Sequence, residues 1–168
     1  MGRNRRGFTL IELLVVIAIM SILTVITVSQ FQNARKKARD VARKGDLNAV
    51  SKAVMMYYTD YGQLPAESSG RLEVGGETVE WGGGEFKDAA GYVYLKTMPR
   101  ENTSGANGYC YVVSADGTKF AILSVLENTE DSEYNKLNED GYTGCGHDGG
   151  YNYVYFSPNA GISDFDGM

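Results

Sequence analysis

The sequence predicts an α+β protein: a long amino-terminal α-helix with a hydrophobic first half, packed on a small antiparallel β-sheet head. Two observations predict the helix, namely the almost unbroken apolar run Phe8–Val28 and the absence of proline between Met1 and Leu64. Alternating runs rich in tyrosine and valine later in the chain predict the strands. Residues 62–168 are enough for a small core, so we expect one head domain on a helical anchor.

Charged residues mark the start of the apolar run. A short basic leader, residues 1–7, carries three arginines, and a single carboxylate, Glu12, lies about one turn inside the run. A helix of about 20 apolar residues spans a bilayer, and residues 8–28 have that length. A charged group inside such a span costs a few kcal/mol and usually marks function. We therefore expect a partner of opposite charge for Glu12.

The helix is expected to continue through residues 29–61. Apolar positions in its second half recur at spacings of three and four residues, which places them on one helix face. These positions are Leu47, Val50, Val54, Tyr57 and Tyr61. Gly62 followed by Pro65 predicts the helix end. At 1.5 Å per residue, a helix from Phe8 to Tyr61 is about 80 Å long, which is more than a globular domain of this size needs.

Three runs predict the main strands of the head. Residues 109–114 and 119–126 flank Ala115-Asp116-Gly117-Thr118, which is a hairpin turn signal. Residues 151–156 form the third run. We expect these runs to form an antiparallel sheet of three or four strands, laid on the apolar face of the helix.

A smaller hairpin is predicted between the helix and these strands. Short alternating runs at residues 71–74 and 77–81 flank Gly75-Gly76. The single tryptophan, Trp81, ends this hairpin. We expect its ring to cover the core, with stacking on a ligand as the alternative.

The residues Gly7-Phe8-Thr9-Leu10-Ile11-Glu12 after a short basic leader carry a specific resemblance. They resemble the processing site of type IV pilins and of the pseudopilins of type II secretion. The resemblance implies cleavage between Gly7 and Phe8 by an inner-membrane prepilin peptidase, followed by N-methylation of Phe8. It also implies an assembly role for Glu12, which family members are thought to pair with the amino terminus of a neighbouring subunit. A carboxylate in a low-dielectric helix bundle needs an opposite charge, and cleavage creates one at Phe8.

The resemblance implies a structural subunit that is not an enzyme. It would assemble through its amino-terminal helix into a type IV pilus-like or type II secretion pseudopilus filament. Its implied partners are copies of itself and other pilin-like subunits, the prepilin peptidase, an inner-membrane assembly platform with its ATPase, and membrane lipid before assembly. The implied location is the bacterial cytoplasmic (inner) membrane, single-pass with the head outside the cytoplasm, and then an extracytoplasmic filament.

The resemblance implies that the chain has four parts. These are a leader peptide at residues 1–7, a transmembrane or filament-core helix at 8–28, an amphipathic continuation at 29–61 and a globular β-sheet head at 62–168. Charge follows this division: the net charge is −5, with a basic neck at residues 29–52 and an acidic head. We expect no nucleic acid binding by the head, because phosphate attraction is the main source of such affinity. The neck fits contact with anionic lipid or acidic neighbouring subunits, or a solvated helix face.

Other interpretations compete with this one. A secretory signal peptide has a shorter apolar region and an A-x-A-like cleavage site, and neither fits. A plain single-pass anchor leaves Glu12 unexplained and places basic residues 35–44 outside, against the positive-inside preference. The functional alternative is a single-pass membrane-anchored extracytoplasmic binding protein that uses its acidic head as a receptor.

No nucleophile–base arrangement suggests catalysis. Cys110 and Cys145 favour one disulfide worth roughly 3 to 4 kcal/mol on the chain-entropy model, with two unpaired thiols as the alternative. The single histidine, His147, is expected to be exposed, and a zinc site is disfavoured because no further soft ligand is available. No cofactor is implied except calcium, for which Asp164 and Asp166 are weak candidates beside plain surface acidity.

Overall fold

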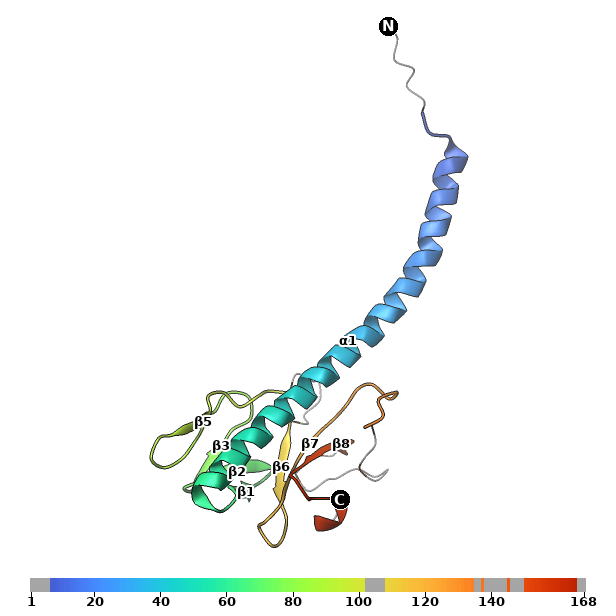
Figure 1. Cartoon of the computed structure of the whole chain (residues 1–168). Coiled ribbons are helices and arrows are strands. Elements are labelled where there is room, and N and C mark those ends of the chain that lie inside the picture. The colour runs from blue at the N-terminus through green and yellow to red at the C-terminus, as the bar shows by residue number, and fades with distance from the viewer. Residues whose placement is uncertain (1–6, 102–107, 135–136, 138–144, 146–149, 166–168) are drawn as a thin grey trace. The chain divides into compact units, whose positions relative to one another are not determined.

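The structure consists of one long helix and several short strands. The computed structural model describes residues 7–101, 108–134, 137, 145 and 150–165, without the side chains of residues 26–29. The chain has two compact units, Met1–Ala38 and Arg39–Met168. Helix α1 (Leu10–Tyr61) contributes residues to both, whereas the described strands all belong to the second unit, the head (Figure 1).

Helix α1 ends where the sequence predicts. Gly62 adopts a left-handed conformation with a φ of 67°, and its N–H donates to the carbonyl of Tyr58 at 2.8 Å. This arrangement is an αL cap, which satisfies a carbonyl of the last turn that has no partner within the helix. A glycine is favoured at Gly62 because a side chain is strained in this conformation.

Most of the predicted apolar face of α1 is buried in the head. The buried positions, each at most 7% exposed, are Leu47, Val50, Val54 and Tyr57. Tyr61 differs from the prediction because it is 45% exposed. It lies in the last turn, where its ring stacks on that of Tyr57 with centroids 4.6 Å apart and its hydroxyl donates to Asp88 at 2.7 Å. The apolar face therefore contributes to the core as far as Tyr57.

The three predicted main strands form one antiparallel sheet. The strands are β6 (Cys110–Val113), β7 (Phe120–Ser124) and β8 (Tyr153–Phe156), in the order β6-β7-β8 (Figure 1). The register pairs Cys110 with Leu123 and Ala121 with Phe156. All five residues of β7 are buried, because this central strand is covered on both faces of the sheet.

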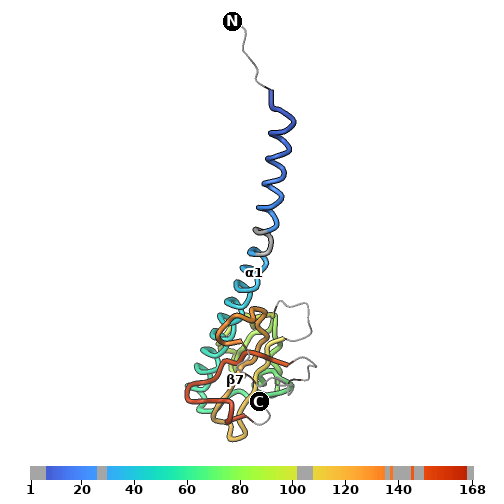
Figure 2. The backbone as a smooth tube through the Cα atoms, turned by 90° about the vertical axis from the view of Figure 1, so that its right-hand side faces the viewer, coloured from blue at the N-terminus to red at the C-terminus, as the bar shows by residue number. Residues whose placement is uncertain are grey.

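The two faces of this sheet contribute to different hydrophobic clusters. Phe120 and Ile122 of β7 belong to the cluster that contains the buried face of α1. Ala121 and Leu123 belong to a second cluster with Phe165, which follows the 3-10 helix η1 (Ile162–Asp164). Figure 2 shows the carboxy-terminal segment, in red, lying across the head near β7. The cluster on the α1 face was predicted from the sequence, whereas the cluster that contains Phe165 was not.

Two smaller sheets complete the described head. The first is antiparallel and consists of β1 (Ala66–Ser68), β2 (Arg71–Val74) and β3 (Glu77–Val79). The second consists of β4 (Phe86–Lys87) and β5 (Val93–Leu95). The predicted hairpin is confirmed, since Gly75 and Gly76 have the positive φ values, 62° and 84°, that a two-residue turn needs. Strands β1, β4 and β5 were not predicted, because two or three residues carry too little alternation.

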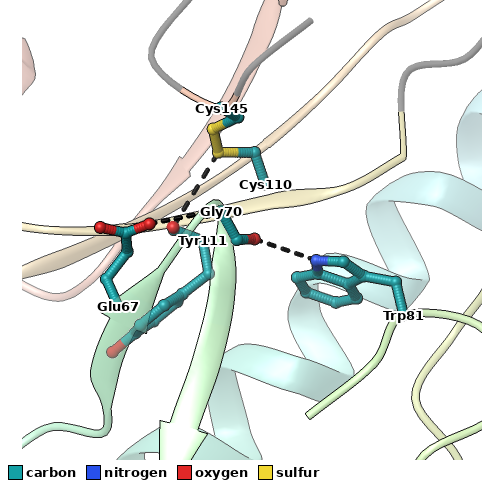
Figure 3. The surroundings of a disulfide bond; sticks show 6 residues. All are labelled: Glu67, Gly70, Trp81, Cys110, Tyr111 and Cys145. Carbon is teal, nitrogen blue, oxygen red and sulfur yellow. Dashed lines mark hydrogen bonds between the residues drawn. A yellow bond between two sulfur atoms is a disulfide. The ribbon is translucent and has the colours of Figure 1, made fainter. Parts of the chain in front are cut away.

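A disulfide joins β6 of the main sheet to Cys145, and the turn between β1 and β2 of the first small sheet lies against it. Cys110 and Cys145 are bonded, as predicted, with their Cα atoms 6.1 Å apart. Gly70, between β1 and β2, lies against this bond (Figure 3); a Cβ atom there would be 3.1 Å from the Cβ of Cys145. The Gly70 carbonyl accepts hydrogen bonds from the Tyr111 N–H at 2.9 Å and from Trp81 Nε1 at 3.0 Å. Trp81 packs against the core cluster, as predicted.

Candidate functional site

The candidate assembly segment begins with a capping box at the start of α1. Glu12 Oε2 accepts hydrogen bonds from the backbone N–H and the hydroxyl of Thr9, both at 2.8 Å, and the Glu12 N–H donates to Thr9 Oγ1 at 3.3 Å. These contacts satisfy N–H groups that have no partner within the helix. This cap was not predicted, although Thr-x-x-Glu is a known sequence signature of a helix start. Glu12 therefore has a local role in addition to any role in assembly.

The predicted processing residues, Gly7 and Phe8, directly precede this cap. Phe8 is 90% exposed, and the space around the Gly7 Cα is open, because an added Cβ atom would meet nothing within 4 Å. Among the described residues, no cation pairs with Glu12. The structure thus shows an accessible Gly7–Phe8 bond and a carboxylate that, among the described residues, accepts hydrogen bonds from Thr9. The rest of the leader lies outside the described residues.

The helix after Glu12 presents an apolar surface without cover in the described chain. Large hydrophobic side chains from Phe8 to Val25 are 48% to 90% exposed. The hydroxyls of Ser21 and Thr24 donate to helix carbonyls four residues earlier, each at 2.7 Å, so these polar groups are satisfied within the helix. By length and composition, this helix qualifies to cross a membrane. Backbone and side-chain polar groups satisfied within one segment are what a bilayer demands.

A buried charge cluster lies where α1 enters the head. Arg43 and Asp40 are only 3% and 2% exposed, and Arg43 Nη1 is 2.5 Å from Asp40 Oδ1. Arg43 Nη2 is 2.6 Å from Glu127 Oε1, and Arg43 Nε is 3.1 Å from Glu101 Oε1 without hydrogen-bond geometry. Asp40 also accepts hydrogen bonds from the backbone N–H groups of Glu127 and Asn128. The cluster therefore attaches α1 to the segment that follows β7.

Two more basic residues of the neck pair with the same segment. Arg39 makes a bidentate contact with Glu127, and Lys44 Nζ is 2.8 Å from both Asp131 and Glu133. Arg39, Arg43 and Lys44 are therefore paired within their own chain, and Arg43 is buried rather than on a solvated face. The sequence could not reveal these pairs, because their partners are 84 to 88 residues away for the hydrogen-bonded contacts.

The two glutamates of the cluster are perturbed in opposite directions. The hydrogen bond from Arg39 is the largest cause that lowers the pKa of Glu127 to about 2, with Arg43 adding to it. Burial raises the pKa of Glu101 to about 7, and the opposing effect of Arg43 is smaller. Glu101 Oε2 has no hydrogen-bond partner among the described residues. Arg43 shares its charge among three carboxylates, so it compensates the burial of Glu101 only in part.

Of the two weak calcium candidates, the structure describes Asp164. Asp164 accepts hydrogen bonds from Lys119 Nζ at 2.6 Å and from the Gly161 N–H at 2.7 Å. Asp166 and His147 lie outside the described residues. Within residues the structure describes, no three His, Cys, Asp or Glu side chains are grouped to hold a metal. The calcium hypothesis therefore stays a prediction.

Comparisons with known proteins identify the family. The family model described as "Prokaryotic N-terminal methylation motif" matches residues 2–28. The chain is 31% identical over 120 residues to the type IV wide pilus major component PilA4 of Thermus thermophilus, covering 68% of this chain and 77% of that protein. The chain belongs to the type IV pilin family. Pilins and pseudopilins are structural subunits rather than enzymes. This pilin is therefore a structural subunit of that kind, as the amino-terminal motif predicts.

Secretion proteins are also similar to this pilin. The type II secretion system core protein G of Pseudomonas aeruginosa is 37% identical over 68 residues, which are 40% of this chain and 48% of that protein. The protein of the same name from Dickeya chrysanthemi is 33% identical over 70 residues, 42% and 46% of the two chains. No solved structure matches this pilin significantly.

We expect substitutions of Arg43 and Arg39 to change the free energy of unfolding by very different amounts. Arg43→Met leaves the buried Asp40 and Glu101 without a cation, so we expect a loss of about 3 to 5 kcal/mol in the free energy of unfolding. Arg39→Met, the matched control, removes a pair whose arginine side chain is 42% exposed, so we expect a much smaller loss. Urea unfolding of the full-length pilin in detergent, followed by Trp81 fluorescence, measures both. Equal losses would contradict the assignment of Arg43 as the central cation.

Glu101 predicts a pH dependence of stability. Its pKa is about 7 in the folded protein against an ordinary value of 4.5, so the folded state binds this proton more tightly than the unfolded state. The contribution is complete below about pH 4.5 and is lost as the pH rises through 7. We expect the free energy of unfolding to fall over this range by at most about 3 kcal/mol. Glu127 acts only below this window, because its pKa is lowered.

The control for this pH dependence is Glu101→Gln, which has no proton to exchange. Its free energy of unfolding should be nearly constant between pH 4.5 and 7, measured by the same fluorescence titration. A fall of the same size in Glu101→Gln would show that another group is responsible.

Proposed function

We propose that this pilin is made as a single-pass inner-membrane precursor, cut between Gly7 and Phe8 by a prepilin peptidase, methylated at Phe8 and assembled into a filament. The observation that carries the proposal is the exposed apolar segment that begins at a capped helix start with Glu12 lacking a described cationic partner. The match of residues 2–28 to an N-terminal methylation motif supports the processing step. The head lies outside the cytoplasm in both the precursor and the filament.

The chemistry of assembly follows from the new amino terminus. Cleavage after Gly7 creates an ammonium group at Phe8, and one N-methyl group leaves this amine protonatable. Within a bundle of apolar helices, Glu12 of a neighbouring copy supplies the opposite charge, because an unpaired carboxylate in a low-dielectric environment is strongly destabilised. Before assembly, the hydrogen bonds from Thr9 and the positive end of the helix dipole partly stabilise this carboxylate.

A long pilus fibre is the favoured product, and a secretion pseudopilus is the second candidate. The match to the Thermus pilus component covers 68% of this chain, so it necessarily extends beyond α1 into the head. The matches to the secretion proteins cover 40% to 42% of the chain. A membrane-anchored binding protein is disfavoured, because such a protein has no use for the processing motif. We also propose the partners that the family implies, which are other pilin-like subunits and an inner-membrane assembly platform with its ATPase.

The processing step predicts a defined mature amino terminus. Intact-mass and amino-terminal analysis of the pilin from its native membrane should give a chain that starts at Phe8 with one added methyl group. A chain that keeps the leader would indicate a plain anchor. A chain cut beyond residue 28 would indicate ordinary secretion, and either result would remove the basis for an assembly role of Glu12.

The two roles of Glu12 can be separated by substitution. Glu12→Gln removes the charge but keeps a side chain able to complete the capping box, whereas Thr9→Ala removes the cap and keeps the charge. We expect Glu12→Gln to be cleaved but to lose filaments about tenfold or more, and Thr9→Ala to assemble. Electron microscopy of antibody-labelled cells and quantification of sheared fibres measure this.

The same micrographs decide between the two products. Long surface fibres at native expression levels support the pilus, and their absence together with normal cleavage supports the pseudopilus. If Thr9→Ala abolished assembly while Glu12→Gln preserved it, the cap rather than the charge would be the functional feature.

A further inference from the structure

An exposed aromatic and acidic surface lies at the end of α1 and the adjoining β5 region. Tyr61 is 45% exposed, Tyr92 is 55% exposed and Val93 is 41% exposed. Two aspartates, Asp60 and Asp88, belong to the same surface, because the hydroxyl of the intervening Tyr94 lies 2.8 Å from Asp60 and 3.5 Å from Asp88. We call Asp60, Tyr61, Asp88, Tyr92 and Val93 the tyrosine–aspartate patch.

The charges of this patch are not neutralised within the described residues. Asp88 accepts hydrogen bonds from the Tyr61 hydroxyl at 2.7 Å and the Tyr92 N–H at 2.8 Å, and Asp60 accepts from the Tyr94 hydroxyl. These donors are neutral, and no described cation forms an ion pair with either aspartate. In the charge cluster, by contrast, Asp40 and Glu127 each contact an arginine. The patch therefore presents two carboxylates beside exposed rings.

The neck presents the complementary chemistry. Arg35 and Lys36 are exposed, and neither forms an ion pair with a described carboxylate. The Arg35 guanidinium lies 4.5 Å from the centroid of the Phe31 ring, which is itself on an exposed residue. An arginine stacked on an aromatic ring keeps its N–H donors free at the edge, where they can reach carboxylates. The neck thus presents cations beside an aromatic ring. The tyrosine–aspartate patch presents carboxylates beside aromatic rings, so the two surfaces are complementary in charge.

We propose that the tyrosine–aspartate patch of one subunit binds Arg35 and Lys36 of a second copy of this chain. This inference rests on the proposed filament function and names one contact within that filament. Charge complementarity selects the occupant, because the patch is acidic and the basic neck is part of every neighbouring copy. The two surfaces differ, so the contact is heterologous, and a heterologous contact that does not close repeats along an open filament. Exposed tyrosines add cation–π attraction to the ion pairs.

Site-directed crosslinking in assembled filaments tests the contact directly. Two full-length versions are co-expressed in the native host, one with Lys36→Cys and one with Tyr92→Cys, and sheared filaments are oxidised. We expect a crosslinked dimer only when both versions are present. Mixed filaments without that dimer would overturn the proposal. Filaments that contain Lys36→Cys with Glu77→Cys, an exposed residue outside the patch, are the matched control and should not crosslink.

Charge reversal provides a second, functional test. Arg35→Glu with Lys36→Glu, and Asp60→Lys with Asp88→Lys, should each lower the yield of sheared filaments at least about tenfold, and combining the two sets should restore most of the yield. Reversing Glu73 and Glu77 to lysine in place of the aspartates should not rescue the neck variant. Loss of assembly by the neck variant without rescue by the patch variant would assign the neck to anionic lipid and overturn the proposal.

The two tests also separate this contact from the proposed function. If the unsubstituted chain is cut at Phe8 and forms filaments, but mixed filaments of Lys36→Cys and Tyr92→Cys give no crosslinked dimer, only the patch contact fails. If the unsubstituted chain forms no filament of any length, the proposed function fails and the contact fails with it. Trp81 fluorescence of each reversed variant shows whether its head is folded, and the crosslinking test does not depend on the reversed aspartates.

Discussion

The apolar surface of residues 8–25 is the constraint on which the rest of this pilin depends. Burying one large aliphatic side chain is worth about 1.5 to 3 kcal/mol, so leaving the whole segment in water would cost on the order of tens of kcal/mol. The described chain supplies no cover for it. Lipid tails and other apolar helices both remove the apolar side chains of this segment from water. Transfer of the segment from a bilayer to a helix bundle therefore changes the hydrophobic free energy little. The direction of assembly must therefore be set by polar contacts.

Few polar groups are available in this segment to set that direction. The hydroxyls of Ser21 and Thr24 are already bonded to their own helix. Glu12 is the one carboxylate in the run, and Thr9 caps it without neutralising it. A cationic amino terminus at Phe8 changes this balance, because each copy then carries one acid and one base near the same end of an apolar helix. In the proposed filament, each copy supplies the opposite charge for its neighbour.

The sequence predicted those features whose signals are local. The end of α1 followed from Gly62, because a left-handed cap needs glycine, and the main strands followed from alternation over four or more residues. The short strands β4 and β5 had no such signal. The amino-terminal site was recognised from its motif, whereas the pairing of Arg43 with Glu127 depends on residues 84 apart. Periodicity cannot report a contact that only the folded chain creates.

The buried charge cluster also limits how α1 can sit within the head. Its buried apolar positions, from Leu47 to Tyr57, repeat every three or four residues, so a shift by one helix turn would still present apolar side chains to the sheet. Such a shift would move Arg43 away from its carboxylates and leave Asp40 without the backbone N–H groups of Glu127 and Asn128. A buried ion pair adds little stability over apolar packing, but breaking it costs several kcal/mol. Asp40 and Arg43 therefore exclude the shifted register and hold residues 39–61 of α1 at one position in the head.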